Sequence, residues 1–306
     1  MGKLKTAIYL LKNRRDLIIP TAFIYFARSK ASHCLSDKVY LKLQYRANLG
    51  KKLNLKDPQT FNEKLQWLKL YNRKPLFTEM VDKYAARKFV SKRIGEEFLV
   101  PLIGAWGSAE EIDFDTLPEQ FVLKCNHDSG SVTICKNKSE LDREAVVKKL
   151  NSKLRWDMFY WSREWPYKNI KRKVICEAYM KDRDFDVLNV FKIMNFNNGE
   201  QIIQVIQNDK TDKESIDYFD TKWNRLDMRQ SFPNSEVPLD KPESLDVMLD
   251  LAKKLSDGFP FLRTDFYEIN GKPYFSEFTF FSDAGMCKFT PKEWDEELGK
   301  RIDIFC

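Results

Sequence analysis

The sequence contains few of the residues that bind soft metals or form disulfides. Only His33 and His127 supply imidazole groups, which argues against a multi-histidine metal centre. The six cysteines include no C-x-x-C pair, and most occur in apolar strand-like runs, as small buried side chains do in a reduced compartment. The chemistry that remains is that of oxygen ligands and hard metal ions.

An apolar run near the N-terminus is too short to cross a membrane. It covers residues 17–27, is interrupted by Pro20, and falls short of the ~20 apolar residues that a bilayer requires. The residues that follow it do not resemble a signal-peptide cleavage site. We therefore expect a cytoplasmic protein whose N-terminal helix either lies on the inner face of the membrane or docks on the body of the protein.

The chain also lacks low-complexity tracts and nucleic-acid-binding signatures. Its formal net charge of +7 favours anionic partners such as nucleotides, acidic polymers or a membrane surface. The basic residues are scattered, and no helix-turn-helix, zinc-finger or RNA-binding pattern occurs, so we predict no nucleic-acid partner.

The periodicity of apolar residues predicts an α+β fold. Residues 1–55 are basic and helical in pattern. Thr60 and Glu63 match a capping box at the start of a helix, and a longer helix is expected over residues 75–94. Short strands then alternate with single helices, which is typical of α+β lobes rather than a doubly wound sheet. We expect strands at 98–103, 120–125, 132–135, 173–179, 186–195 and 201–207, and helices at 141–154 and 244–255.

The segment 261–279 predicts a β-hairpin that turns at Asn270-Gly271, a strong short-range hairpin signal. A two-residue loop would pair Asp265 with Ser276 and send Glu277 to the opposite face. A shared face therefore requires an odd-length loop or a β-bulge, which the turn glycine could permit through a positive φ.

The hairpin carries the polar residues that suggest a site. Because residues two apart in a strand share a face, Arg263 points the same way as Asp265, and Glu277 the same way as Thr279. If the two faces coincide, the oxygens could hold Mg²⁺ beside a guanidinium that binds phosphate. The alternative is a half-buried hairpin with a buried ion pair.

Other candidates come earlier in the chain. Lys124 ends a strand before the polar turn 126–130, where a lysine and backbone N–H groups could hold phosphates. Glu177 ends an apolar strand and could accept a hydrogen bond from a ribose hydroxyl, with the neighbouring backbone at an adenine edge. The alternatives are an ordinary strand end for Lys124, a salt-bridged strand end for Glu177 and a solvated surface residue for Lys83.

Together these residues resemble the TupA-like (teichuronopeptide-biosynthesis-like) family of the ATP-grasp superfamily. The similarity runs from about residue 40 to the end, and the matching phrases lie at 60–71, 81–84, 121–127, 164–170 and 263–271. The resemblance implies two α+β lobes with the nucleotide between them. The chain would then divide into a helical extension (1–55), an N-terminal subdomain (56–105), a small lobe with the phosphate loop (106–180) and a large lobe with the metal-binding hairpin (181–306).

The resemblance also implies that ATP and Mg²⁺ bind between the lobes. Phosphate contacts would come from Lys83, Lys124 and Ser129, the ribose contact from Glu177, and the adenine contacts from the backbone of Ala178, Tyr179 and Met180. The magnesium ligands would be Asp265, Glu277 and Thr279. Arg263 and Lys124 would act on the transferring phosphoryl group as catalytic residues.

The implied chemistry is activation of a carboxylate to an acyl phosphate, followed by attack of an amine to form an amide. With a basic surface, the predicted substrates are an amine or amino acid and a uronic acid of an acidic cell-surface polysaccharide or its precursor. Three departures bear on substrate identity and catalytic competence. Thr279 stands where the superfamily commonly has Asn, Asp128 stands where the family usually has glycine, and the segment 282–285 is less glycine-rich than expected.

Other functions stay open. Asp182-Arg-Asp184 is an Asp-x-Asp, which in many glycosyltransferases holds a metal and a sugar nucleotide, so a transferase of capsule or O-antigen biosynthesis is one alternative. An ATP-grasp kinase that phosphorylates a sugar is another. Asp128 and Thr279 motivate a third, a non-catalytic nucleotide-binding protein.

Overall fold

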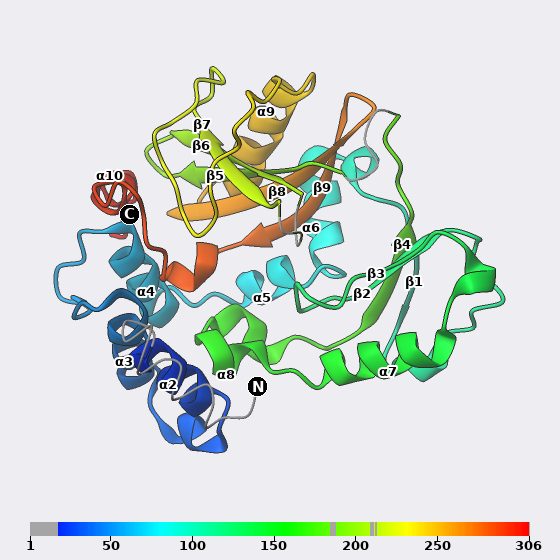
Figure 1. Ribbon diagram of the computed structural model, residues 1–306, viewed down its shortest axis with the longest axis horizontal. Helices are drawn as coiled ribbons and strands as arrows, with labels where there is room; N and C mark the ends of the chain where they lie inside the picture. The colour runs from blue at the N-terminus through cyan, green and yellow to red at the C-terminus, as the bar shows by residue number, and fades with distance from the viewer. Residues whose placement is uncertain (1–17, 184–187, 209–210, 212, 306) are drawn as a thin grey trace.

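The computed structural model describes residues 18–183, 188–208, 211 and 213–305. Its strands form two antiparallel sheets that face each other across the central helices (Figure 1). The first sheet has the order β1-β4-β2-β3, with β1 (Leu102–Trp106), β2 (Phe121–Cys125), β3 (Thr133–Cys135) and β4 (Val174–Ala178). The second has the order β7-β6-β5-β8-β9, with β5 (Val190–Phe196), β6 (Gln201–Gln207), β7 (Ser215–Phe219), β8 (Phe261–Ile269) and β9 (Lys272–Thr279).

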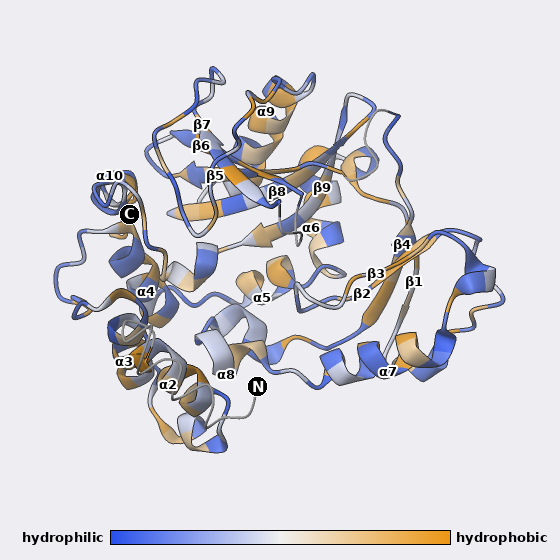
Figure 2. Cartoon of the chain, in the orientation of Figure 1, coloured by the Kyte–Doolittle hydropathy of each residue, from blue (hydrophilic) through white to orange (hydrophobic). Residues whose placement is uncertain are grey.

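Helices cover one face of each sheet and leave the other faces toward the middle of the molecule. α7 (Arg143–Leu154) packs on the first sheet through Leu150, which joins a core with Phe121 and Leu123. α9 (Leu245–Ser256) packs on the second sheet through Met248 and Leu255. Figure 2 shows the apolar residues concentrated on the strands of both sheets, while α10 (Trp294–Lys300) is largely hydrophilic.

Three α-helices directly precede the first sheet in the chain. α4 (Phe61–Tyr71) begins with the predicted capping box, in which Thr60 Oγ1 accepts from the Glu63 backbone and the Glu63 carboxylate accepts from the Thr60 backbone. The predicted helix over 75–94 is wrong, because the chain breaks into α5 (Pro75–Val81) and α6 (Ala86–Ile94). At the break, Asp82 Oδ1 accepts hydrogen bonds from two backbone N–H groups, which replace the helical ones.

The predicted strand at 98–103 is also displaced. Residues 96–98 form a 3₁₀ turn, and the strand β1 begins only at Leu102, after Pro101. Proline has no N–H to donate to a sheet, but its carbonyl accepts from the Ala178 backbone at 2.9 Å. The predicted boundary between residues 105 and 106 falls inside β1, while the division into subdomains stays a prediction.

The other predicted elements form close to their expected places. The loop at 155–173 contains α8 (Met158–Ser162) and a 3₁₀ turn at 165–169. Residues 186 and 187 of the strand predicted at 186–195 lie outside the described part of the chain. None of the five cysteines in the described part of the chain forms a disulfide. Cys34 is exposed, and the other four are buried: Cys125, Cys135, Cys176 and Cys287. Cys306 lies outside the described residues.

The described part of the N-terminal extension docks on the body of the protein. α2 (Ile18–Ala27) packs on α3 (Asp37–Leu49), and the Tyr40 hydroxyl donates to the carbonyl of Trp161 at 2.7 Å. The Arg163 guanidinium lies 4.4 Å from the ring centroid of Tyr40. Searching the described residues alone, we find no helix long and apolar enough to span a bilayer.

Candidate functional site

A β-bulge sets the register of the β8–β9 hairpin. The turn residues Asn270 and Gly271 have positive φ values of 52° and 74°, and Ile269 pairs with Lys272 across a two-residue loop. Further along β9 the pairing shifts by one residue, because Phe266 pairs with Phe275 and Asp265 with Glu277, which leaves Ser276 as the extra residue. Of the two alternatives required for a shared face, an odd-length loop or a bulge, the structure has the bulge, and it lies within the strand and not at the glycine turn.

The bulge brings the four candidate side chains of the hairpin to one face. Asp265 lies directly opposite Glu277, and Arg263 lies opposite Thr279. In a hairpin without the bulge, Glu277 would point to the other face of the sheet. The shared face predicted for these residues is thus present in the structure.

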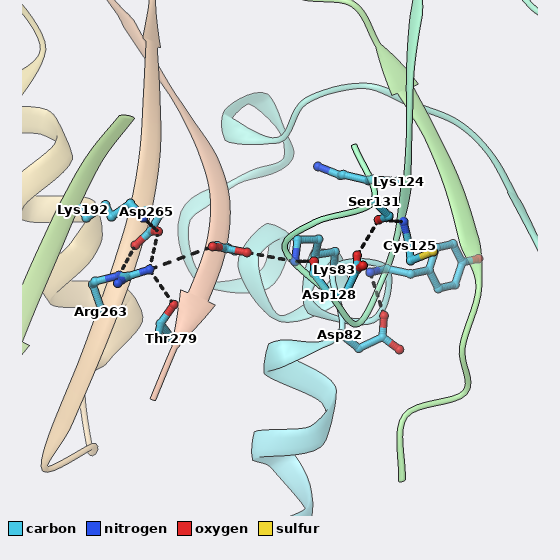
Figure 3. Close-up of polar contacts among 12 residues, drawn as sticks. Asp82, Lys83, Lys124, Cys125, Asp128, Ser131, Lys192, Arg263, Asp265 and Thr279 are labelled. Atoms are coloured by element: carbon cyan, nitrogen blue, oxygen red, sulfur yellow. Dashed lines mark hydrogen bonds and ion pairs between the residues drawn. The ribbon is translucent and has the colours of Figure 1, made fainter. Parts of the chain in front are cut away.

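Arg263 and Asp265 form a bidentate ion pair on this face (Figure 3). The guanidinium Nε donates to Oδ1 at 2.8 Å and Nη2 donates to Oδ2 at 2.9 Å. Nη2 also donates to Thr279 Oγ1 at 3.0 Å, and Nη1 donates to Ser282 Oγ at 3.2 Å. Burial would lower the pKa of Arg263, but Asp265, Glu277 and Asp283 together raise it. The ion pair of the alternative interpretation is therefore present.

Glu277 connects the hairpin to the centre of the molecule through Lys83. Lys83 Nζ lies 2.9 Å from Glu277 Oε2, and it also donates to the carbonyl of Asp128 at 2.8 Å. Burial alone would raise the pKa of Glu277, but Lys83, Lys192 and Arg263 lower it to about 2. Lys83 is therefore no solvated surface residue. It lies in the turn between α5 and α6 and touches both lobes.

The polar loop after β2 is folded by its own buried side chains. Asn126 is fully buried, and its amide donates to Asp82 Oδ1 at 2.8 Å and to a backbone carbonyl of residue 171 at 3.0 Å. The Asp128 carboxylate accepts from the Ser131 hydroxyl, which in turn accepts from the Cys125 backbone at 2.7 Å. Asp128 thus shapes the loop, and Ser129 is exposed at its tip.

Lys124 and Glu177 face each other on the inner side of the first sheet. Their side chains form an ion pair at 2.5 Å, and Arg87 Nη1 from α6 lies 3.8 Å from Glu177. The salt-bridged strand end of the alternative interpretation is therefore observed. The backbones of Tyr179 and Met180, just after β4, make no hydrogen bond to another described residue, so their polar groups are free for a ligand.

Sequence reasoning missed two cations of the site. Lys192 on β5 pairs in register with Asp265 on β8, and its Nζ lies 3.7 Å from Oδ2. Arg87 reaches Glu177 from α6. Strand order and helix packing bring both into place, and neither is visible as a local motif.

Ion pairs join the charged side chains of the site. The cations are Lys83, Arg87, Lys124, Lys192 and Arg263, and the carboxylates paired with them are Glu177, Asp265 and Glu277. The Asp128 and Asp283 carboxylates also act on Lys83 and Arg263, so the site holds charges of both signs. Within the described residues no group of three or more His, Cys, Asp and Glu side chains is arranged to hold a metal. Asp265 and Glu277 fit Mg²⁺ only if Thr279 and ligand oxygens complete the set.

Asp182 of the Asp-x-Asp motif supports the hairpin turn. Its Oδ2 accepts from the Asn270 backbone at 2.6 Å, and the Arg183 backbone donates to Asn270 Oδ1 at 3.0 Å. Asp182 is buried, while Asp184 lies outside the described residues. A structural role therefore accounts for the one described acid of the motif.

Several solved structures are similar to the chain at low identity. D-alanine–D-alanine ligase from Bacillus anthracis, complexed with ATP, is 14% identical with a TM-score of 0.38, and the match covers 71% of this chain and 57% of that one. L-amino acid ligase from Bacillus licheniformis is 13% identical with a TM-score of 0.43, over 82% of this chain and 56% of that one. D-alanine–D-alanine ligase from Helicobacter pylori is 14% identical with a TM-score of 0.41, over 79% and 69%.

The chain thus spans little more than half the length of the first two ligases. A search of curated protein sequences finds no match. A family model described as TupA-like ATPgrasp matches residues 63–303, which is most of the chain. The predicted family and α+β fold are confirmed: the chain belongs to the TupA-like ATP-grasp family.

Proposed function

We propose that the protein is an ATP- and Mg²⁺-dependent carboxylate–amine ligase. The observation that carries the proposal is the register of the hairpin. The bulge at Ser276 puts Arg263, Asp265 and Glu277 on one face, and Lys83 links that face to the loop of the other lobe. An ATP-grasp ligase needs such a set of charges between two lobes, because phosphoryl transfer depends on positioning and charge neutralisation.

The nucleotide would bind between the inner faces of the two sheets. Lys83, Lys124 and the exposed Ser129 would contact its phosphates, and Glu177 would accept from the ribose. The free backbone groups of Tyr179 and Met180, with Ala178, would pair with the adenine edge. Support comes from the five cations of the site and from these unpaired polar groups.

The metal would lie against the hairpin, with Asp265, Glu277 and Thr279 as its protein ligands. When bound, Mg²⁺ would neutralise charge on the phosphates of ATP. Arg263 already holds Asp265 in a fixed rotamer with both carboxylate oxygens engaged. It would keep that carboxylate oriented while one nitrogen of the guanidinium contacts the transferring phosphoryl group.

The reaction would proceed in two balanced steps. A substrate carboxylate oxygen attacks the γ-phosphorus, the bond to the bridging oxygen breaks, and ADP leaves. The amine nitrogen then attacks the acyl carbon, phosphate departs, and the nitrogen loses a proton. The proposed substrates are an amine or amino acid and the carboxylate of a uronic acid in a cell-surface polysaccharide or its precursor, which the net charge of +7 favours.

Product mass tests the proposal directly. The protein is incubated with ATP, Mg²⁺, one amino acid and one uronic acid glycoside, and ADP release is followed together with the mass of the product. A product lighter than the two summed reactants by one water supports ligation. A product heavier than one reactant by a phosphate group indicates a kinase, and the absence of ADP release from every pair contradicts both.

A further inference from the structure

A polar cavity lies beyond the hairpin, outside the proposed nucleotide site. Its volume is about 630 Å³, within the ~300–1000 Å³ range of ligand pockets. It is bounded by the N-terminal helices α2 and α3, by the loop that follows β7 and by the segment that follows β9. The only charged side chains that line it in the described part of the chain are Arg229 and Lys288.

One of the two cations is placed by backbone pairing. The Arg229 N–H donates to the carbonyl of Thr290 at 2.8 Å, and the Thr290 N–H donates back at 2.9 Å. Residues directly opposite in an antiparallel pair share a face, and so do residues two apart along a strand. Arg229 and Thr290 therefore lie on one side of this bridge, and Lys288 lines the same cavity. Among the described residues, no Asp or Glu side chain lines the cavity beside either cation, so both charges are available to a ligand.

The remaining lining suits a sugar rather than a bare anion. Phe232 leaves 38% of its surface exposed, and an aromatic face is a surface on which a sugar ring can stack. Gln230 is buried; its Oε1 accepts from the Tyr218 hydroxyl, while its amide N–H groups have no partner among the described residues. A fixed amide donor beside two cations matches a ring that carries hydroxyl groups and a carboxylate.

The cavity is close to the hairpin face. Arg263 donates to Ser282, and Met286, four residues later, lines the cavity. Consecutive Cα atoms are ~3.8 Å apart, so the Cα atoms of Ser282 and Met286 are at most ~15 Å apart. The cavity is thus near enough to hold one part of a substrate while another part reacts.

We infer that this cavity is a subsite for a second acidic sugar, the uronate unit next to the one whose carboxylate reacts. The substrate class rests on the proposed function, whereas the position and charge of the subsite rest on the cavity itself. A ligand with two or more adjacent uronates would bind both places, so it should bind more tightly than a single uronate.

The test compares trigalacturonate with galacturonate and with the methyl ester of the trimer, using isothermal titration calorimetry on the full chain. For the native protein we expect the trimer to bind at least tenfold more tightly than the monomer and than the uncharged ester. In the Arg229→Gln, Lys288→Gln double variant this advantage should disappear, since each charged hydrogen bond is worth roughly tenfold in affinity.

Lys292→Gln is the matched control, because Lys292 is exposed on the same segment and does not line the cavity. It should bind the trimer as the native protein does. Cooperative thermal unfolding at the melting temperature of the native protein, measured without ligand, shows that the double variant is folded. Equal affinity for trimer, ester and monomer in the native protein, or an unchanged trimer affinity in the folded double variant, would overturn the inference.

These outcomes separate the subsite from the proposed function. If the trimer advantage depends on Arg229 and Lys288 but no amide product forms, the ligase proposal fails and the subsite stands. If a single uronate is ligated equally well by native protein and double variant, and the trimer gains nothing, the ligase proposal stands and the subsite fails.

Discussion

At the scale of single residues, the hairpin carboxylates have two competing interpretations. Asp265 is 1% exposed and bound by both arms of the Arg263 guanidinium, so a structural ion pair explains it without any metal. Glu277 has a side chain that is 26% exposed, and it pairs with Lys83. Removing a charge should therefore affect both activity and stability at each position.

We expect Asp265→Asn and Glu277→Gln each to reduce ADP release by a hundredfold or more. The loss of one well-placed electrostatic contact costs about 3 kcal/mol of transition-state stabilisation. Asp265→Asn should also lower the free energy of unfolding by about 3 kcal/mol or more, because it leaves a buried guanidinium without its partner. Near-normal ADP release from folded Glu277→Gln would exclude it as a metal ligand. Glu297→Gln, on an exposed helical ion pair, is the control that should change neither quantity.

The stability of the protein should fall in acid through Glu277. Its pKa is about 2 in the folded protein, below its usual value of 4.5, so its contribution is complete above pH 4.5 and is lost as the pH falls toward 2. Urea unfolding between pH 6 and pH 2 checks this. The stability difference between the native protein and Glu277→Gln should shrink steadily over that range, and a constant difference would show that the carboxylate is not held ionised by Lys83.

At the scale of secondary-structure elements, Asn126 holds three segments together. Its side chain bonds Asp82 at the α5–α6 break and the chain before β4, where the Lys173 N–H donates to Oδ1 at 2.8 Å. Asn126→Ala should lower the free energy of unfolding by about 3 kcal/mol or more, because each buried group left unpaired costs about 1–3 kcal/mol.

Ser129→Ala is the control in the same loop. Ser129 is exposed, so its loss should change the unfolding free energy by no more than ~0.5 kcal/mol. The same variant should weaken the thermal stabilisation by ATP if Ser129 contacts phosphate. Urea denaturation that gives both variants equal stability would contradict the role assigned to Asn126.

The sequence is sufficient to predict elements whose signals are local. The capping box at Thr60 and the turn at Asn270-Gly271 depend on neighbouring residues and are both present. Elements that depend on a residue from a distant part of the chain are harder to predict. The break between α5 and α6 involves Asn126 as well as Asp82, and nothing in the local helical pattern indicates it.

The candidate site shows the same division. Alternation along a strand groups Arg263 with Asp265, but the bulge that adds Glu277 could be stated only as a requirement. Lys192 joins the site through the order of strands β5 and β8, which a single sequence does not define. Contacts between the two lobes depend on the whole fold, and those of Lys83 are the main example.

At the scale of the whole molecule, one lysine joins the two lobes. Lys83 Nζ contacts Glu277 on the hairpin and the carbonyl of Asp128 in the opposite loop. A nucleotide that binds between the sheets would meet this contact, together with the Lys124–Glu177 pair. ATP should therefore stabilise both lobes as one unit, because a ligand that binds only the native state raises its stability by mass action.

The most direct test of an ATP site is the shift in melting temperature caused by ATP with Mg²⁺, compared with that caused by a uridine sugar nucleotide. At a concentration one hundred times its Kd, ATP should add roughly 2.7 kcal/mol of stability, and the sugar nucleotide should add little. Lys124→Ala should reduce the ATP shift. A larger shift with the sugar nucleotide than with ATP, or no shift with either, would contradict a nucleotide site of the ATP-grasp kind in this protein.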